Sequence, residues 1–575
     1  MTVNYAKHYN KKQTPQSEKI PGEKQVANNA GGYVYEVDKW QRLARFLILG
    51  TDGGTYYVSE RKLTRENAQV VEACLATDGG RTIAEIIEIS QTGRAPKNDQ
   101  AVFALALAAS VQVPDASGVS AESIRSMALD ALPKVCRIPT HLFQFMTAIK
   151  AMRGSSRMLR RALGEWYSQW DANKLAYELV KYQSREGWAN RDVLRLAHPK
   201  MSAEHQAVVR WAVCGHEAAA SPGPREVKRA KEDTRTSRIY QPVADVPNII
   251  AAFELAKTKP PVELLVRLIR EHGLTREMLP TECLNEVAVW EALLEKMPLT
   301  AMIRNLGKMS SLGIFEPLKS SAWSKHVVER ITSQENLRKS RVHPLFILNA
   351  MKTYAQGHGD KGSLKWTPAA KIVDALDAAF YEAFGNVEPT GKNVMLALDV
   401  SGSMGSLIGG TSLSCREACA ALALVTQAVE DNVQIVGFTN GGSVARRSQW
   451  GGYLSGISPL KISKRQRLDD VVKYIAGLNF GGTDCALPMI YAESEKLDVD
   501  GFVVYTDNET WAGDIHPSQA LRSYRAKQNK PEAAQVVVGM TASGFTIASP
   551  DDPRTLDVVG FDLATPTAIS AFIKG

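Results

Sequence analysis

The stretch Met395–Met404, MLALDVSGSM, places an apolar run directly before one carboxylate and two hydroxyls. The run Val394–Leu398 has the length of a short buried strand. Asp399, Ser401 and Ser403 follow it in a turn, and their oxygens are the hard donors that Mg²⁺ prefers. The stretch therefore predicts a strand that holds a divalent cation at its carboxyl end.

After residue 365 the chain alternates between apolar runs of strand length and segments with helical spacing. We expect strands at Val394–Leu398, Val433–Phe438, Gly501–Tyr505, Gln535–Met540 and Leu556–Gly560. We expect helices at Ser414–Glu430, Leu468–Leu478, Leu487–Leu497, His516–Arg525 and Thr565–Lys574. This alternation is typical of a doubly wound, mostly parallel sheet, whose site lies beyond the carboxyl ends of its strands. Residues 366–575 are therefore predicted to form a Rossmann-like α/β domain.

Two further segments place oxygen donors at the same edge of the predicted sheet. Thr483 follows a pair of glycines, and Asp507 follows an apolar run and a threonine. Together with Asp399, Ser401 and Ser403, these residues resemble the metal-ion-dependent adhesion site of von Willebrand factor A domains. The resemblance implies that Mg²⁺ or another divalent cation is bound directly by the three hydroxyls, with the two carboxylates acting directly or through water.

The mostly neutral ligand set has a chemical consequence. A cation held by hydroxyls keeps much of its charge and accepts an oxygen from a partner's carboxylate or phosphate. The enzymatic alternative is a phosphatase in which Asp399 is the nucleophile. Phosphatases of the dehalogenase type need Asp-x-Asp, whereas this sequence has Ser401 in the second position. We therefore predict coordination at this site and no hydrolysis.

The bulk composition excludes several classes of protein. The 575 residues are 44% hydrophobic and 23% charged, as in ordinary soluble globular proteins. No apolar run approaches the roughly 18–20 residues that span a bilayer. The start of the sequence is polar and lacks the apolar core of a signal peptide. The seven cysteines are scattered, without a CxxC pair. We therefore expect a reducing, cytoplasmic location.

The net charge of +8 conceals an asymmetry between two regions. Over residues 1–365, 52 Lys and Arg against 38 Asp and Glu give +14, whereas 17 against 23 over residues 366–575 give −6. A basic region followed by an acidic one indicates two domains with different partners. The basic part is suited to a polyanion, above all nucleic acid. The alternative interpretation is a basic surface that only keeps the protein soluble.

The basic region reads as a succession of helices. Residues 1–31 are polar and rich in turn formers, so we expect a tail without regular structure. In Arg45–Glu60, the β-prone runs Phe46–Leu49 and Tyr56–Val58 flank a glycine-rich turn, which predicts a β-hairpin; a phosphate-binding loop is the alternative, on weaker evidence. From Thr64 to Tyr354, segments of 12–18 residues carry apolar positions at helical spacing. Ten or more such segments predict an α-solenoid of stacked helix pairs.

Basic residues cluster in three places within this helical region. The clusters are Lys150, Arg153, Arg157, Arg160 and Arg161; Lys181, Arg185, Arg191, Arg195, His198 and Lys200; and the charged insertion Arg225–Arg238. Trp166, Tyr167, Tyr182 and Trp188 lie among the first two clusters, as expected if aromatic rings stack on unpaired bases. The alternatives are that the aromatic residues belong to the core and that the insertion is a solvated loop.

Long motifs of this chain resemble the Ro autoantigen family, of bacterial or phage type. The motifs are NAGGYVYEVDKWQRLARFLILGTDGGTYYV, VCRIPTHLFQF, MPLTAMIRNLGKM, RVHPLFIL, LDAAFYEAFGNVEPTGK, GGTDCALPMIYA, VVYTDNETWAGDIHP and GFTIASPDDP. The resemblance implies a TROVE module over 32–365, which is a monomeric ring of HEAT-like helix pairs, and a von Willebrand factor A domain over 366–575. It also implies that Y RNA binds the outer basic surface and that single-stranded 3′ ends of misfolded RNA enter a central hole. In bacteria, members are tethered through Y RNA to polynucleotide phosphorylase.

The same resemblance assigns RNA contacts to individual residues. The stretch KYQSREGWANRDVLRLAHPK matches the family pattern and places Lys181, Arg185 and His198 at RNA-binding positions. The stretch RMLRRALGEWY places Arg157, Arg160 and Arg161 on a basic helix. The predicted function is a non-enzymatic RNA-binding scaffold for quality control of non-coding RNA. The alternatives are a metal-dependent protein-adhesion module with a structural helical region, and a nuclease.

Overall fold

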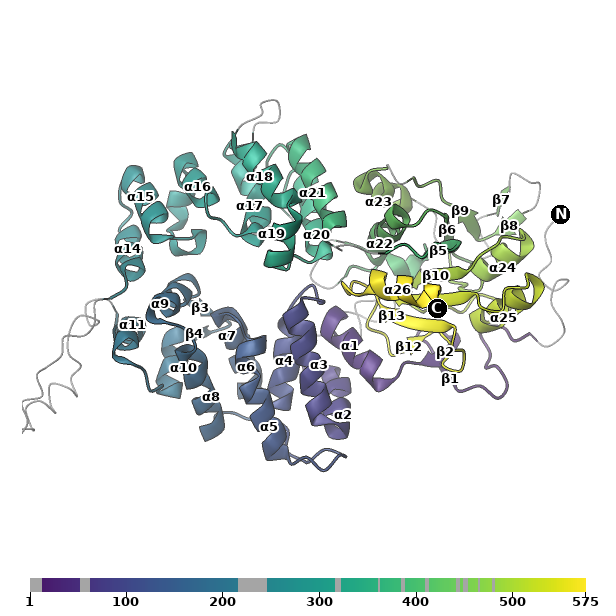
Figure 1. Cartoon of the computed structure of the whole chain (residues 1–575), viewed down its shortest axis with the longest axis horizontal. Helices are drawn as coiled ribbons and strands as arrows, with labels where there is room; N and C mark the ends of the chain where they lie inside the picture. Colours follow the sequence, from purple (N-terminus) through teal and green to yellow (C-terminus); the bar gives the residue numbers. More distant parts are fainter. Residues whose placement is uncertain are drawn as a thin grey trace, which may run out of the picture.

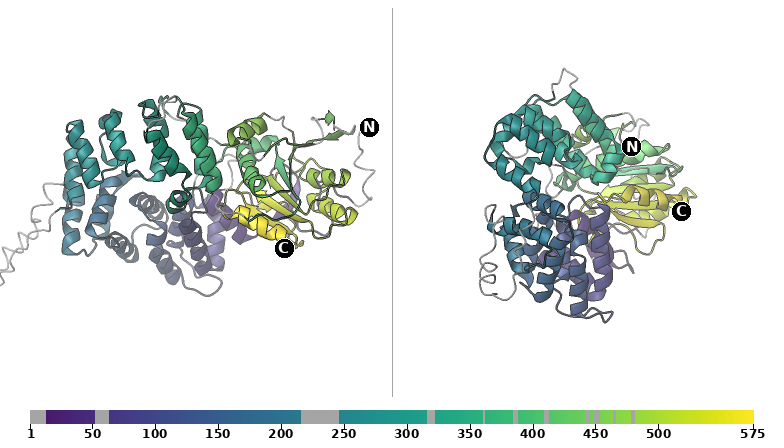
Figure 2. Two further views of the ribbon diagram at one scale, coloured as in Figure 1. Left: turned by 45° about the horizontal axis from the view of Figure 1, so that its top comes forward. Right: turned by 60° about the vertical axis from the view of Figure 1, so that its left-hand side comes forward.

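A computed structural model gives the architecture of the chain. It describes residues 13–51, 63–215, 246–315, 322–359, 362–383, 388–408, 413–440, 445–447, 453–463, 466–477 and 481–575. Two parts are visible, an arc of helices and an α/β domain that lies against both ends of the arc (Figures 1 and 2). The predicted fold class, a ring of helices followed by a doubly wound A domain, is confirmed.

The helical ring is built from packed antiparallel neighbours. Its helices are α1 (Lys39–Leu49), α2 (Gln69–Thr77), α3 (Gly79–Thr92), α4 (Asp99–Ala108), α5 (Ala121–Asp130), α6 (Leu132–Val135), α7 (Pro139–Met152), α8 (Arg157–Ser168), α9 (Ala172–Lys181), α10 (Asn190–Ala197), α11 (Ala203–Cys214), α14 (Asn248–Lys257), α15 (Val262–His272), α16 (Val287–Leu294), α17 (Leu299–Ser311), α18 (Ala322–Thr332), α19 (Gln334–Ser340), α20 (Pro344–Ala355) and α21 (Ala370–Glu382). Each buries an apolar stripe against its neighbours, which is how a solenoid forms one continuous core.

The α/β domain, called the A domain below, contains a six-stranded sheet in the order β13-β11-β10-β5-β6-β9. The strands are β5 (Val394–Asp399), β6 (Val433–Phe438), β9 (Ile457–Pro459), β10 (Gly501–Thr506), β11 (Ala534–Gly539) and β13 (Thr555–Val559). All pairs are parallel except β6 with the edge strand β9. The helices are α22 (Cys415–Val429), α23 (Leu468–Ala476), α24 (Leu487–Ser494), α25 (Pro517–Lys527) and α26 (Thr565–Lys574), and a separate short hairpin pairs β7 (Ala445–Arg447) with β8 (Tyr453–Ser455).

The central strand β5 is buried on both faces, as its continuous apolar sequence requires. Met395 and Ala397 pack with α24 and α25 on one face. Leu396 and Leu398 face the other way, toward α22 and α26, in a core that continues into the helical ring. The register Leu396↔Val503 brings the carboxyl ends of β5 and β10 to the same sheet edge, where Asp399 ends β5 and Asp507 follows β10.

Residues 13–31 differ from the expected polar tail, because they are part of the A domain. Strand β1 (Gln25–Ala27) pairs with β2 (Tyr33–Glu36), and β2 pairs with β12 (Phe545–Thr546) of the A domain. Gly32 lies so close to this domain that a Cβ atom there would come within 1.9 Å of the Thr510 carbonyl oxygen. The expectation was wrong here, because the polar residues of this segment bond to distant partners that local composition does not reveal.

The predicted hairpin at Arg45–Glu60 is also wrong where it can be checked. Phe46–Leu49, expected as its first strand, is the last turn of helix α1. The side chain of Asp38 caps this helix by accepting from Trp40 N at 2.8 Å. Leu43, Phe46 and Leu47 form its buried stripe. Packing therefore overrides β propensity, and residues 52–62 lie outside the described chain.

The boundary between the two parts falls later than residue 365. Helix α21 packs against α18 and α20 of the ring. Its buried residues include Ile372, Leu376 and Phe380. The A domain begins after α21, shortly before β5, so residues 366–382, which the prediction places in the α/β domain, belong to the ring.

The two ends of the ring meet at the turn that follows β13. Arg94, between α3 and α4, forms a bidentate ion pair with Asp562, with Nη2 at 2.6 Å from Oδ2 and Nε at 3.0 Å from Oδ1. His343, before α20, contacts the Phe561 carbonyl oxygen through Nε2 at 2.7 Å, and its Nδ1 accepts from Leu345 N at 3.1 Å. Burial lowers the pKa of His343 to about 4, so the imidazole is neutral and Nε2–H is the donor. The A domain therefore closes the ring.

Candidate metal site and basic surface

The carboxyl end of β5 brings one carboxylate and two hydroxyls together. Ser401 N donates to Asp399 Oδ1 at 2.9 Å, and the two hydroxyl oxygens of Ser401 and Ser403 lie 3.0 Å apart. The short 3₁₀ turn Gly402–Gly405 carries Ser403 back over the strand end. All three side chains are buried. The turn therefore presents the donors that the sequence predicts, on one side of Asp399.

The other two predicted donors lie on adjoining loops. Gly402 N donates to Gly481 O at 3.3 Å, and Trp511 N donates to Thr483 O at 3.1 Å, so the loops after β5, before α24 and after β10 meet at one edge. Asp507 is buried, and its Oδ2 has no hydrogen-bond partner among the described residues. Burial, with the nearby Asp399 carboxylate, raises the pKa of Asp507 to about 8. Burial also raises the pKa of Asp399.

These observations fit a hard divalent cation. Burial raises the pKa of both carboxylates, as expected where two acidic groups lie close together away from water. The unpaired Oδ2 of Asp507 and the hydroxyls of Ser401 and Ser403 are oxygen donors of the kind that such a cation binds. Within the described ranges, no three His, Cys, Asp or Glu side chains form a metal-binding group. A cation here would accordingly be held largely by hydroxyl oxygens.

Several residues around this edge were not predicted. Thr506 Oγ1 donates to Asp399 Oδ2 at 2.7 Å, which fixes the carboxylate. Arg416 on α22 is buried and donates from Nη2 to Ser401 O at 2.9 Å. Thr506 stands next to the predicted ligand Asp507 but matches no ligand position itself, and a lone arginine in a helix carries no metal-site pattern, so neither role was predicted.

The N-terminal segment forms hydrogen bonds with the loops that carry the predicted metal ligands. Gln16 donates from Nε2 to Asp484 Oδ1 at 2.7 Å and to Ile515 O at 2.8 Å. Asn29 Nδ2 donates to Glu509 Oε1 at 2.6 Å. Asp484, next to the predicted ligand Thr483, is therefore engaged with the protein and is not a free donor.

The predicted RNA-binding residues gather on neighbouring elements of the ring. Helix α8 and the end of α9 carry four of the six, and His198 is the C-cap of α10. The hairpin of β3 (Ser184–Arg185) and β4 (Trp188–Ala189) carries Arg185. Helix α8 packs on α10, and the hairpin packs on α7. The two central residues of the hairpin turn, Glu186 and Gly187, have φ of 53° and 76°, as a two-residue type I′ turn requires. We call Arg157, Arg160, Arg161, Lys181, Arg185 and His198 the basic surface.

Lys181 lies among aromatic rings, and Arg185 lies exposed on the neighbouring hairpin. Lys181 Nζ is 5.4 Å from the ring centre of Tyr177 and 5.2 Å from that of Tyr182. Burial opposes its charge, but Tyr182 and Tyr177 together raise the pKa of Lys181 above its ordinary value. The Arg185 side chain is 62% exposed, and its nearest acidic partner, Glu186, is 3.5 Å away. Both residues therefore carry a positive charge that an anion can reach.

The three arginines of α8 project into solvent. Arg157, Arg160 and Arg161 are exposed, whereas Leu159 and Leu163 on the opposite stripe are buried. Arg161 lies 3.6 Å from Glu165, an exposed pair that contributes little. His198 is also exposed and ends α10 in the left-handed conformation, with φ of 46°. His198 therefore does not belong to the core.

The aromatic residues near the basic surface form two groups, one in the core and one at the surface. Trp166 and Tyr167 are fully buried, and Tyr167 Oη donates to Asn190 Oδ1 at 2.9 Å. Tyr182 and Trp188 are half-buried, and Lys150 Nζ lies 5.4 Å from the Trp188 ring centre. Two rings belong to the core, and two remain open to a base. The insertion Arg225–Arg238 lies outside the described residues.

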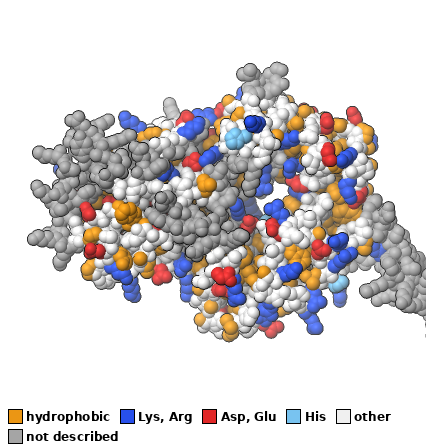
Figure 3. Space-filling view, turned by 180° about the vertical axis from the view of Figure 1, so that it is seen from behind, with side chains coloured by type: hydrophobic (Ala, Val, Ile, Leu, Met, Phe, Trp, Pro, Cys, Tyr) orange, Lys and Arg blue, Asp and Glu red, His pale blue; other side chains and the backbone are white. Residues whose placement is uncertain are grey.

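On the face opposite to that of Figure 1, Lys and Arg side chains are spread over the helical part, and the surface is hollowed between the two rows of helices (Figure 3). The helices described by the structure include none that combines the length and the apolar character needed to cross a membrane.

Comparison with known proteins agrees with this two-part architecture. Residues 26–353 match the TROVE domain, and residues 393–573 match the Ro60 vWA domain. The chain is 38% identical over 599 residues to the RNA-binding protein RO60 of Caenorhabditis elegans, covering 96% of this chain and 90% of that protein. It is also 38% identical over 564 residues to the RNA-binding protein RO60 of Deinococcus radiodurans, covering 98% and 97%.

A solved structure shares the fold. The crystal structure of the Deinococcus radiodurans RO (RSR) protein matches 94% of this chain and 100% of that chain, with a TM-score of 0.66 and 36% sequence identity. Both domain matches, their order and the near-complete coverage point to one family. The chain therefore belongs to the Ro60 family, in which a TROVE domain is joined to a von Willebrand factor A domain, and is a Ro orthologue of the bacterial type.

Proposed function

We propose that this protein binds small non-coding RNA, as a scaffold for RNA quality control. The RNA would be Y RNA or a Y-like RNA on the basic surface, with single-stranded 3′ ends of misfolded RNA in the central hole. The observation that carries the proposal is that five permanent cations, in Arg157, Arg160, Arg161, Lys181 and Arg185, reach solvent from packed neighbouring elements. Several closely spaced cations are what a phosphate backbone requires, and two RNA-binding relatives share the family.

The proposal predicts weaker RNA binding when charge is removed near the hairpin. For Lys181→Ala/Arg185→Ala, the loss of two phosphate contacts lowers affinity on the order of 50-fold at 0.1 M salt. A gel shift with a Y-like hairpin RNA measures this, with Lys325→Ala on α18 as an exposed control. An unchanged affinity in the double variant would contradict the assignment of the basic surface.

We propose further that Mg²⁺ binds Ser401, Ser403 and Thr483, with Asp399 and Asp507 completing the site. The cation supplies a Lewis-acidic position for an oxygen of a partner molecule. Ser401→Ala/Ser403→Ala is expected to lower Mg²⁺ affinity at least about 10-fold in calorimetry, because two hydroxyl donors are lost. RNA affinity stays within about twofold, since the basic surface lies on the ring. Unchanged Mg²⁺ affinity in this variant would show that the cation does not bind at this edge of the sheet.

The proposed scaffold has no catalytic step of its own. The alternative function, a metal-dependent adhesion module with a structural ring, would be favoured if the purified protein bound no RNA. A nuclease predicts Mg²⁺-dependent loss of RNA on prolonged incubation.

We also propose that the protein is a monomer in the cytoplasm and that Y RNA connects it to polynucleotide phosphorylase.

A further inference from the structure

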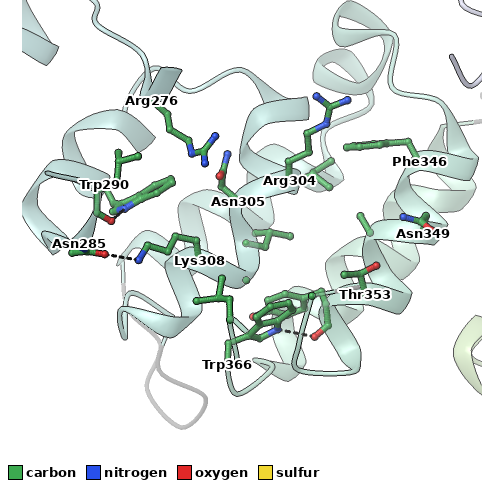
Figure 4. A pocket seen from close by; sticks show the side chains of 18 of the residues that line it. Arg276, Asn285, Trp290, Arg304, Asn305, Lys308, Phe346, Asn349, Thr353 and Trp366 are labelled. Atoms are coloured by element: carbon green, nitrogen blue, oxygen red, sulfur yellow. Dashed lines mark hydrogen bonds between the residues drawn. The ribbon is translucent and has the colours of Figure 1, made fainter. Parts of the chain in front are cut away.

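A pocket of about 490 Å³ opens between helices α17 and α20 of the ring (Figure 4). The short segments Arg276–Met278 and Thr281–Asn285 and the loop residue Trp366 complete its walls. This volume lies within the range of small-molecule sites, roughly 300–1,000 Å³. None of its lining residues belongs to the basic surface or to the metal site, so it is a third feature of the molecule.

The lining of this pocket is positively charged. Arg276, Arg304 and Lys308 contribute to it, and none of the described lining residues is acidic. Arg276 and Arg304 are exposed. Lys308 Nζ donates to the amide oxygen of Asn285 at 2.9 Å, so its charge is oriented without being neutralised. An occupant with negative charge is therefore favoured.

Aromatic rings and amides also line the pocket. Arg304 lies 5.3 Å from the ring centre of the half-buried Phe346. Trp366 stacks on Tyr354 at 6.2 Å, with 20° between the rings. A Cβ atom on Gly307 would come within 2.8 Å of the Trp366 ring, so this glycine is needed for the ring to lie here.

Two amides offer polar contacts between these rings. Asn305 on α17 is held by its own donation to Ala301 O at 2.7 Å, and Asn349 stands across the pocket on α20 (Figure 4). Aromatic faces bind a base by stacking, and amides form hydrogen bonds with its edge. Cations, rings and amides therefore come together in a space large enough for one nucleotide.

We propose that this pocket binds one unpaired nucleotide, with its phosphate near Arg304 and Lys308 and its base against the aromatic wall. The proposal rests on the RNA binding proposed above and adds a defined subsite to it. The nucleotide belongs either to a single-stranded RNA segment or to a free mononucleotide, and both share this chemistry.

Fluorescence anisotropy with a labelled uridine hexamer tests the proposal. At 0.1 M salt, Arg304→Ala/Lys308→Ala is expected to weaken hexamer binding about 25-fold, because two single-strand phosphate contacts are lost. Phe346→Leu keeps an apolar side chain without a stacking face and weakens binding at least about 5-fold. Lys325→Ala, which removes one exposed charge from α18, leaves binding within about twofold. Thermal unfolding confirms that each variant is folded.

Two further measurements distinguish the two sources of the nucleotide and separate the pocket proposal from the proposed function. Displacement of the hexamer by UMP or AMP identifies a free nucleotide as sufficient, and no displacement identifies the RNA chain as the ligand. A blunt hairpin RNA reports on the basic surface alone. If the pocket variants bind the hexamer like the wild type while Lys181→Ala/Arg185→Ala loses the hairpin, only the pocket proposal is overturned. If the wild type binds neither RNA, the proposed function fails with it.

Discussion

Replacing Arg45 with alanine is expected to lower the free energy of unfolding by about 3–5 kcal/mol, because it leaves a buried carboxylate without its partner. Arg45 is on helix α1 of the ring, yet its side chain is fully buried against the A domain. Its Nη2 lies 2.7 Å from both carboxylate oxygens of Asp557 on β13. Its Nη1 donates to Phe545 O at 3.0 Å and to Ser543 O. One side chain thus joins the first ring helix to two strands of the other domain.

Chemical denaturation of the wild type and the variant measures this loss. The control is the double variant Arg45→Met/Asp557→Leu, which removes both charges and should recover most of the stability, since apolar replacement of a whole buried pair is often nearly neutral. If the free energy of unfolding of Arg45→Ala lies within about 1 kcal/mol of the wild-type value, the ion pair does not hold the two domains together. If the double variant is as unstable as Arg45→Ala, lost packing is the cause instead.

Removing the three arginines of α8 is expected to have the largest effect on the affinity for RNA. Arg157→Ala/Arg160→Ala/Arg161→Ala loses three phosphate contacts, which lowers affinity for a Y-like RNA on the order of 500-fold at 0.1 M salt. The slope of log affinity against log salt falls by about 3. The fold should survive, because all three side chains are exposed and the apolar stripe of α8 is untouched. Filter binding over a salt series measures both quantities.

The matched control removes the same charge from the other domain. Arg522, Lys527 and Lys574 are partly exposed on the A domain, where they pair with Glu23, Glu493 and Glu388. Their triple alanine variant has the same net charge as the α8 variant and is expected to bind RNA within about twofold of the wild type. Equal losses in the two variants would show that overall charge, and not the basic surface, governs binding.

The parts of the fold that local pattern determines were predictable. The strand Val394–Asp399 and the helix Thr565–Lys574 end where apolar periodicity ends, so both were placed within a residue. The position of the predicted oxygen donors at one sheet edge could be inferred for the same reason, because parallel strands bring their carboxyl ends to one edge. Arg157, Arg160 and Arg161 lie on one helix, as the motif RMLRRALGEWY predicts, whereas Arg185 lies on a β-hairpin.

The features that were missed depend on long-range partners. Gln16 reaches Asp484 across most of the chain, and β2 pairs with β12, so polar composition alone indicated a tail. Phe46–Leu49 has β-prone residues but completes a helix because its apolar stripe packs in the ring. The pocket between α17 and α20 combines residues from Arg276 to Trp366, which no single motif contains.

The central claim is that the basic surface binds the phosphate backbone of RNA, and salt dependence tests it most directly. Equilibrium binding of a Y-like hairpin RNA to the wild-type protein should be measured at 50 mM and 200 mM monovalent salt. With five phosphate contacts, the affinity is predicted to fall by two to three orders of magnitude over this range. Equal affinities at the two salt concentrations would contradict the account.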